Sequence, residues 1–188
     1  MSLDNHHIIE HLSVLKEDIS AIDTFAKKVS RMIIENTKNN GVTVWAGNGG
    51  SASQASHLAA ELMGRYQRNR PPIPSLSLAA DNALTTCVGN DFGFEQIFTR
   101  QIEGLKSFSP IVILLSTSGC SDNILGAASY CHKNKIPTVT MTGTKGKKLS
   151  GISSLGYICS SDNTAIIQEL HLLTGHLICE YVEKDVAL

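Results

Sequence analysis

The sequence predicts a three-layer α/β/α sandwich with a five-stranded, mainly parallel sheet and a long N-terminal helix. Short runs rich in β-branched residues alternate with segments of helical periodicity, which is typical of α/β proteins. The run IVILL at residues 111–115 is apolar on both faces, as expected for a central strand covered by helices on two sides. Two of the expected strands end in loops, at residues 47–51 and 116–121, that are rich in glycine or serine.

Length and composition exclude several classes of protein. The chain has 188 residues, 42% of them hydrophobic, and a net charge of −1, which fits a single globular domain over residues 1–188. The charge lacks the excess of basic residues typical of nucleic-acid binders. No apolar run reaches the roughly 20 residues needed to cross a bilayer, and the first residues do not resemble a signal peptide. We therefore expect a cytoplasmic protein without a nucleic-acid or membrane partner.

The five cysteines are odd in number and form no C-x-x-C pair. This pattern argues against a disulfide framework and against a cysteine zinc site. Most of these cysteines are expected to be small core residues.

Residues 5–38 are expected to form one long helix. Its apolar residues recur alternately four and three positions apart, which is a heptad pattern. The members are Ile8, Leu12, Leu15, Ile19, Ile22, Ala26, Val29 and Ile33. The helix either folds back on its own domain or packs against another subunit. Because the seam is longer than one small domain needs, we predict that the helix is used in oligomer packing.

The first strand, at residues 42–46, leads into the run GNGGS at residues 47–51. Glycine permits a tight loop lined with backbone N–H groups, which suits a phosphate, although an ordinary strand-to-helix turn is the alternative. The helix expected at 51–66 places His57 and Glu61 on one face, and RNRPP at 68–72 ends it. The glycine loop also matches a loose dinucleotide-binding pattern, but Asp81 follows Gly47 by 34 residues, where about 20 is expected.

The next elements alternate in the same way. Four elements are expected before the central strand. They are a strand at 75–79, a helix at 82–88, a turn over GNDFG at 89–93 and a helix at 94–106. The loop STSGCS at 116–121 carries four hydroxyls and can hold a compact phosphate without a basic residue; a serine-rich capping turn without a ligand is the alternative.

After this loop we expect a helix at 122–133, strands at 138–142 and 157–160, and a helix at 164–184. Eight residues of helix place Gln168 and His176 within about 80° of each other, so both can face one site.

Five runs together carry a resemblance that covers nearly the whole chain. They are GNGGS (47–51), HLAAELMGRY (57–66), GNDFGF (89–94), STSG (116–119) and QELH (168–171). In this order they closely resemble the phosphoheptose isomerases of the sugar-isomerase (SIS) domain superfamily, whose fold is flavodoxin-like. The combination of His57, Glu61, Gln168 and His176 resembles the heptose enzymes in particular.

The resemblance implies an aldose-ketose isomerase that converts D-sedoheptulose 7-phosphate to D-glycero-D-manno-heptose 7-phosphate, for bacterial lipopolysaccharide or capsule. It also implies a homotetramer with active sites between subunits. The implied catalytic pair is Glu61 and His176. The implied substrate-binding residues are Asn48, Gly49, Gly50, Glu61, Asn90, Asp91 and Gln168, with Ser116, Thr117, Ser118 and Ser121 at the phosphate. The implied ligands of one zinc ion per subunit are His57, Glu61, Gln168 and His176.

These residue types suit the chemistry. A carboxylate can remove a proton from carbon, and an imidazole can move protons between oxygens near neutral pH. Zinc would polarise the carbonyl and stabilise an enediolate oxygen, although an amide oxygen is an unusual zinc ligand. The alternative for His57 and Glu61 is a helical hydrogen-bonded pair without a catalytic role.

Two positions depart from the family pattern. Cys120 stands where the phosphate loop often has asparagine, and Ile166 stands where an arginine commonly precedes the Ile-Gln-Glu run. The first affects the phosphate loop and the second the contacts near the sugar. A non-catalytic SIS protein that binds sugar phosphates or acts as a scaffold, and an isomerase of another ketose phosphate, are the alternative functions.

Overall fold

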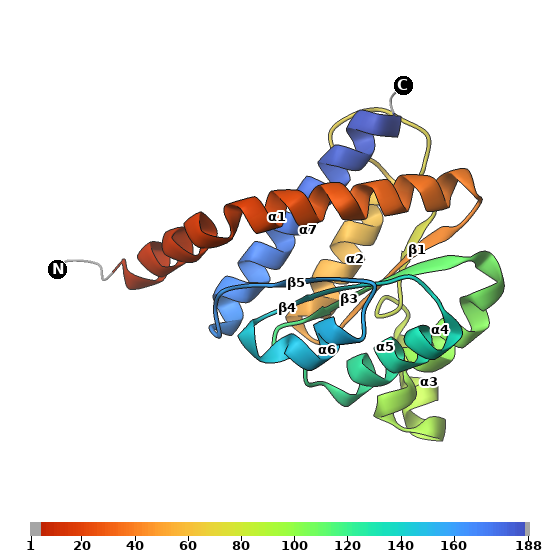
Figure 1. Cartoon of the computed structure of the whole chain (residues 1–188). Coiled ribbons are helices and arrows are strands. Elements are labelled where there is room, and N and C mark those ends of the chain that lie inside the picture. The colour runs from red at the N-terminus through yellow and green to blue at the C-terminus, as the bar shows by residue number, and fades with distance from the viewer. Residues whose placement is uncertain (1–4, 187–188) are drawn as a thin grey trace.

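The computed structural model describes residues 5–186, and its centre is a five-stranded, fully parallel sheet (Figure 1). The strands are β1 (Val42–Gly47), β2 (Ser75–Ser77), β3 (Pro110–Ser116), β4 (Thr138–Thr142) and β5 (Leu155–Ile158). Their order in the sheet is β2-β1-β3-β4-β5. The predicted α/β sandwich is therefore confirmed, and the sheet is parallel throughout.

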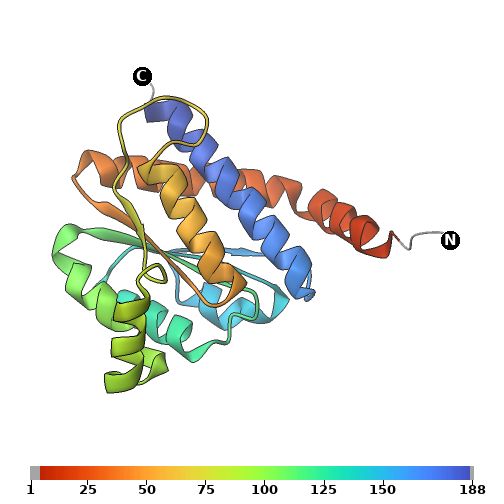
Figure 2. The ribbon, with the colours of Figure 1, turned by 180° about the vertical axis from the view of Figure 1, so that it is seen from behind.

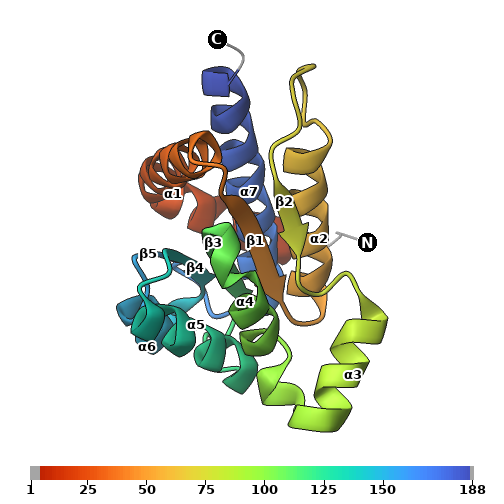
Figure 3. The same cartoon turned by 90° about the vertical axis from the view of Figure 1, so that its right-hand side faces the viewer.

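Helices cover both faces of the sheet, as the view along its edge shows (Figure 3). One layer holds α1 (His6–Lys38), α2 (Gly50–Met63) and α7 (Thr164–Val186). The other holds α3 (Asn82–Phe92), α4 (Thr99–Leu105), α5 (Asp122–Asn134) and α6 (Lys147–Gly151), with short 3₁₀ turns at Phe94–Gln96, Lys106–Phe108 and Thr144–Gly146. Each layer buries its own apolar cluster against the sheet: Trp45 and Ile113 face the first layer, and Val44 and Val112 the second.

The strand order reverses direction between β1 and β3. From β1 the chain moves to the edge strand β2, then returns to place β3 on the other side of β1. The carboxyl ends of β1 and β3 lie side by side, with Gly47 paired with Leu115. Ligands of open parallel sheets bind where neighbouring connections diverge in this way. The glycine and serine loops both begin at this point.

Helix α1 is divided between two environments. The seam residues of its second half, including Ile22 and Ile33, are buried in the first apolar cluster. In its first half Ile8, Leu12 and Ile19 are 58–59% exposed, and this end projects beyond the body of the molecule (Figures 1 and 2). Folding back on the same chain therefore accounts for the second half of the predicted seam, and for the first half the seam stays a prediction of subunit packing.

Polar contacts hold α1 in place at both ends of its exposed segment. Asp18, which is buried, accepts hydrogen bonds from the Tyr157 hydroxyl (2.6 Å) and from the backbone N–H (2.9 Å) and hydroxyl (2.6 Å) of Ser160. Nearer the N-terminus, His7 Nε2 and His11 Nδ1 contact the two carboxylate oxygens of Glu169 on α7, at 2.9 and 2.5 Å. These contacts fix the direction in which the helix leaves the domain.

Two of the expected local boundaries were wrong. The run GNDFG does not form a turn, because α3 continues to Phe92 and ends at Gly93, whose φ of +91° suits glycine. Asp81 caps the start of α3 by accepting the N–H of Leu84, and a single Gly89 inside the helix costs only about 1 kcal/mol. The helix expected at 94–106 is divided into a 3₁₀ turn, α4 and a second 3₁₀ turn.

Three other elements have bounds that differ from the expected ones. β2 ends at Ser77, two residues early, and β5 begins at Leu155, two residues early, after the short unpredicted helix α6. Helix α2 ends at Met63, three residues early, and the backbone N–H of Tyr66 binds the distant Glu183 carboxylate instead of a helical carbonyl. Within residues 5–186, no helix combines the length and the apolar composition that a membrane span requires.

His171 is buried in the core against the Tyr157 ring. Within residues 5–186 neither of its ring nitrogens has a hydrogen-bond partner of good geometry, although the Thr142 backbone lies near. Burial lowers the pKa of this imidazole to about 4, and the Thr142 backbone opposes the shift in part. His171 is therefore neutral in the folded protein at neutral pH.

The burial of neutral His171 predicts a loss of stability in acid. Below about pH 6.5 the unfolded chain binds a proton that the folded chain refuses until about pH 4, so stability falls as the pH falls through this window. By this linkage His171 should account for about 2 kcal/mol of the loss between pH 7.5 and pH 5. Urea unfolding of His171→Leu should show a shallower pH dependence, whereas His132→Leu, at an exposed position, should keep that of the unmodified protein.

Candidate functional site

The glycine and serine loops enclose a small polar pocket at the carboxyl ends of β1 and β3. The pocket has a volume of about 70 Å³. Its lining residues are Asn48, Ser51, Leu115, Ser116, Thr117, Ser118, Ser121 and Gln168. The structure thus brings together residues from both loops and from α7, including all four positions that the resemblance assigns to a phosphate.

Hydroxyl groups of the serine loop accept backbone hydrogen bonds. Ser116 Oγ accepts the N–H of Gly119 at 3.1 Å, and Ser118 Oγ accepts the N–H of Cys120 at 3.2 Å. A hydroxyl that accepts a hydrogen bond keeps its own hydrogen for donation. The loop can therefore donate to an anion from hydroxyls whose positions its own backbone fixes.

The two neighbouring glycines of the first loop serve different purposes. Gly49 has φ +53°, in the left-handed region that glycine favours. Gly50 begins α2, and a Cβ atom at this position would lie 2.6 Å from the Nε2 atom of Gln168. Gly50 is therefore required so that the Gln168 amide can lie over the start of α2, next to the pocket.

A pair of amides joins the two loops. The Asn48 side chain donates to Oδ1 of Asn123 at 2.8 Å, and Asn123 donates back to Oδ1 of Asn48 at 2.9 Å. Asn123 is 2% exposed and lies in the first turn of α5. Sequence reasoning missed this residue, because only its place just after the serine loop hinted at a role. Its bonds fix the width of the pocket.

The second part of the site lies further along α2 and α7, which pack side by side. Gly175 permits this approach, because a Cβ there would collide with the Leu58 side chain. His57 Nε2 and His176 Nε2 are 2.8 Å apart, and their rings meet edge to face with centroids 5.1 Å apart. Glu61 Oε1 lies 3.5 Å from His57 Nε2. Three of the residues that the resemblance assigns to catalysis or metal binding therefore lie in contact.

The surroundings of His176 favour its neutral form. Burial lowers the pKa of this imidazole most, His57 lowers it further, and Glu61 opposes the shift. A neutral imidazole offers one nitrogen as a donor and one as an acceptor. His176 can therefore move protons near neutral pH or serve as a metal ligand.

The donors fit a zinc ion by chemical type, but their present arrangement does not form a metal centre. No three His, Cys, Asp or Glu side chains among residues 5–186 are placed to hold a metal ion together. Two nitrogen ligands of tetrahedral zinc lie about 3.3 Å apart, given zinc–nitrogen bonds of about 2.0–2.1 Å. His57 and His176 are closer than that, and Gln168 lies over Gly50 instead. Zinc binding would require these side chains to move.

Asn90 and Asp91 are not brought to either part of the site within the subunit. They lie near the end of α3, in the other helical layer, and both are exposed. The Asn90 amide donates to Oδ1 of Asp91 at 2.8 Å, and the Cys87 thiol lies 3.6 Å from the other carboxylate oxygen.

A buried ion pair joins the segment after α2 to helix α7. Arg70 Nε and Glu183 Oε1 are 3.2 Å apart, and their side chains are 1% and 2% exposed. Glu183 also accepts the backbone N–H groups of Tyr66, Gln67 and Arg68 at 2.7–2.9 Å. Burial alone would raise the pKa of Glu183, but these donors and Arg70 outweigh it and lower the pKa below its ordinary value. Glu183 is therefore ionised and fully paired.

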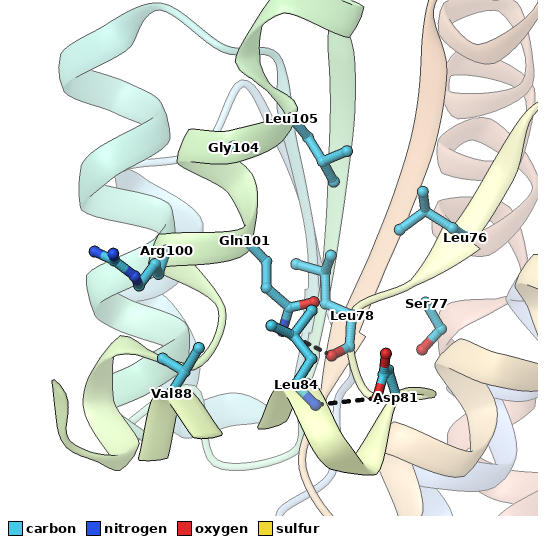
Figure 4. A pocket seen from close by; sticks show the side chains of 10 residues that line it. All are labelled: Leu76, Ser77, Leu78, Asp81, Leu84, Val88, Arg100, Gln101, Gly104 and Leu105. Atoms are coloured by element: carbon cyan, nitrogen blue, oxygen red, sulfur yellow. Dashed lines mark hydrogen bonds between the residues drawn. The ribbon is translucent and has the colours of Figure 1, made fainter. Parts of the chain in front are cut away.

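A larger pocket of about 450 Å³ lies between β2, α3 and α4 (Figure 4). It is mostly apolar, and its polar groups already have partners in the chain. Asp81 caps α3, Gln101 donates to the carbonyls of Leu78 and Ile97, and the Arg100 guanidinium lies 3.8 Å from the centre of the Phe92 ring. Because the pocket is mostly apolar and these side chains are engaged within the chain, we assign the site to the two loops and the α2–α7 contact.

Comparison with known proteins shows the family to which this chain belongs. A family model described as the SIS domain matches residues 7–143. Phosphoheptose isomerase of Sulfurimonas denitrificans is 42% identical over 160 residues, 85% of this chain and 82% of that protein. That of Helicobacter pylori strain P12 is 36% identical and covers 95% of this chain and 93% of its own length. A solved phosphoheptose isomerase from Francisella tularensis has a TM-score of 0.90 at 30% identity, with 96% of each chain covered.

The buried ion pair generates a prediction about stability. Removing one partner of such a pair leaves an unpaired buried charge and costs about 3–5 kcal/mol. Glu183→Ala should therefore lower the free energy of unfolding by about this amount in urea titrations. Glu180→Ala is the matched control, since Glu180 pairs with Lys184 at the surface of the same helix and such pairs contribute about 0–1 kcal/mol. Equal losses in the two variants would contradict the assignment.

Proposed function

We propose that this protein interconverts D-sedoheptulose 7-phosphate and D-glycero-D-manno-heptose 7-phosphate. The chain belongs to the SIS domain family and, within it, to the phosphoheptose isomerases. The observation that carries the proposal is the placement of a polar pocket and a carboxylate–imidazole pair along the same two helices. Gln168 lies at the pocket and His176 two turns further on, a rise of about 12 Å. A seven-carbon sugar phosphate in its open form can span this distance, with its phosphate in the pocket and its carbonyl between Glu61 and His176.

The pocket binds the phosphate through neutral donors. Ser116, Thr117, Ser118 and Ser121 supply hydroxyls, and the start of α2 supplies backbone N–H groups together with its positive dipole end. Asn48, Gly49, Gly50 and Gln168 contact the sugar next to the phosphate.

The acid/base step takes place at the other end of the sugar. The Glu61 carboxylate removes the proton from the carbon beside the carbonyl, and the electron pair of that C–H bond forms an enediolate. Neutral His176 moves a proton between the two oxygens, and Glu61 returns its proton to the neighbouring carbon. The carbonyl has then moved by one carbon, and no atom is gained or lost.

We also propose one zinc ion per subunit, held by His57, Glu61, Gln168 and His176. The nitrogen and oxygen donors of these side chains and the neutral state of His176 support this assignment, and binding would require the two histidines to move apart. When bound, zinc supplies a Lewis acid that polarises the carbonyl.

The assembly that we propose is a homotetramer with sites completed by neighbouring subunits. The exposed apolar residues Ile8, Leu12 and Ile19 of α1 support it, since they form one end of a seam whose other end is buried. Asn90 and Asp91 would then reach a neighbouring subunit's site.

The setting that we propose is the cytoplasm, in heptose synthesis for lipopolysaccharide or capsule. Free thiols at all five cysteines suit a reducing compartment. A scaffold that only binds sugar phosphates would have no use for Glu61 and His176 as a pair. The function is tested by incubating the protein with a panel of ketose phosphates and following aldose formation by NMR; binding without turnover would favour the scaffold.

Replacing Glu61 by Gln tests the general base. The variant keeps the size of the side chain but loses the carboxylate, so kcat should fall about 10²–10⁴-fold. Ser118→Ala is the contrasting variant, because it should act mainly on KM. Exchange of the substrate C1 and C2 hydrogens with deuterated water measures the proton abstraction directly. Zinc content is measured on each sample, and exchange at the unmodified rate in Glu61→Gln would remove Glu61 from the mechanism.

A charge on the exposed seam of α1 tests the assembly. Leu12→Glu should lower the molar mass measured by light scattering at micromolar concentration, because it places a carboxylate in an apolar contact. Lys28→Glu, on the opposite face of the same helix, should leave the mass unchanged. A monomeric unmodified protein would contradict the proposal.

A further inference from the structure

We propose that Tyr66 is a positioning residue for His176, and that the buried Arg70–Glu183 pair acts on catalysis by holding Tyr66 in place. The inference deepens the proposed function, on which it rests, because it assigns a role to residues that touch neither substrate nor reacting atoms.

The Tyr66 ring lies on one face of the His176 imidazole. The ring centroids are 5.4 Å apart and the planes are inclined by 25°, a stacked arrangement. The edge of the His57 ring approaches His176 as well, at 72° to its plane. His176 is therefore in contact with two rings in different orientations.

These ring contacts define the orientation of the His176 imidazole, because rotation about the last side-chain bond of histidine has little energetic preference of its own. The rotation of the imidazole about its last bond has broad, roughly two-fold minima, so it is defined by packing rather than by its own energetics. Its present orientation directs Nε2 at Nε2 of His57, which in turn lies 3.5 Å from Glu61. A turned imidazole would move Nε2 away from the site. The stacked Tyr66 ring opposes that turn.

Tyr66 owes its place to Glu183. It lies three residues beyond the end of α2, where no helix holds the backbone. The Glu183 carboxylate instead binds the N–H of Tyr66 at 2.7 Å and those of the next two residues at 2.9 Å. Since Glu183 and His176 are on the same helix, the carboxylate fixes Tyr66 relative to His176.

Arg70 connects the same point to Glu61. Its guanidinium donates to the backbone carbonyls of Glu61 and Leu62, both at 2.7 Å, while its Nε lies 3.2 Å from Glu183. One ion pair thus links the end of α2, which carries Glu61, to α7, which carries His176. The Arg70–Glu183 pair therefore fixes the position of Glu61 relative to His176.

The ring of Tyr66, rather than its hydroxyl, does the positioning. The contact with His176 is made by the face of the ring, whereas the hydroxyl interacts with the Gln67 side chain, which opposes the effect of burial on its pKa. Burial raises the pKa of Tyr66, so the phenol stays protonated at neutral pH. A phenylalanine would supply the same flat surface, whereas a leucine would fill much of the volume without it.

The test compares Tyr66→Phe with Tyr66→Leu. Tyr66→Leu should lower kcat about tenfold to a hundredfold, the scale expected for a misplaced catalytic group, and should change KM less than threefold because the phosphate pocket is intact. Tyr66→Phe should keep kcat within twofold of the unmodified protein. Tyr181→Leu is the matched control: it removes a part-buried tyrosine of α7 that binds Asp23 and has no role at His176.

A second measurement needs no turnover. The nuclear Overhauser effect between the His57 and His176 ring protons should persist in Tyr66→Phe and weaken or vanish in Tyr66→Leu, with thermal unfolding confirming that each variant is folded.

Each outcome supports or overturns one statement. Unchanged kcat and an unchanged ring contact in Tyr66→Leu overturn the inference, as does an equal loss of kcat in Tyr66→Phe, which would assign the role to the hydroxyl. A rise in KM alone would make Tyr66 a substrate contact instead. An unmodified protein that does not isomerise the sugar phosphate contradicts the proposed function, while the ring contact still tests the positioning.

Discussion

The close, parallel packing of α2 and α7 is the constraint on which the whole site depends. Both helices begin at the carboxyl edge of the sheet, so Gly50 meets Gln168 near their starts and His57 meets His176 two turns later. Gly175, buried between the helices against Leu58, permits the separation that these contacts require. A glycine inside a helix costs about 1 kcal/mol relative to alanine. That cost is offset by the contacts that the short separation makes possible, and the rest of the fold serves to hold the two helices at this distance.

The phosphate-binding groups and the acid/base groups lie at different positions along these helices. At the loop end, hydroxyls, backbone N–H groups and an amide line the pocket without a basic side chain. At the other end, a carboxylate lies close to two imidazoles. A lysine close to Glu61 would lower the pKa of that carboxylate and make it a weaker base. Neutral donors two turns away bind the phosphate without placing a positive charge beside the acid/base pair.

Much of the architecture could be predicted from local patterns. The apolar run at 111–115 and the two loops indicated the parallel sheet and its ligand-binding edge, and helical spacing placed His57 beside Glu61. The path of α3 could not be predicted, because the glycine-rich run resembles a turn and only the cap at Asp81 and the packing around it keep the helix intact. The partners Asn123 and Glu183 were missed for another reason: each binds a segment remote in sequence, and local patterns carry no information about such pairing.

The buried ion pair has a consequence for how the sequence of this protein can change over time. Arg70 and Glu183 lie far apart in the sequence, yet each would be left as an unpaired charge in the interior if the other were lost. A substitution at only one of the two positions would therefore destabilise the fold, so a replacement by apolar residues has to occur at both positions. Because the same carboxylate also binds three backbone N–H groups, an apolar exchange would release the segment after α2. Across descendants of this chain, the two positions should vary together or not at all, with the ring at position 66 retained wherever the pair is.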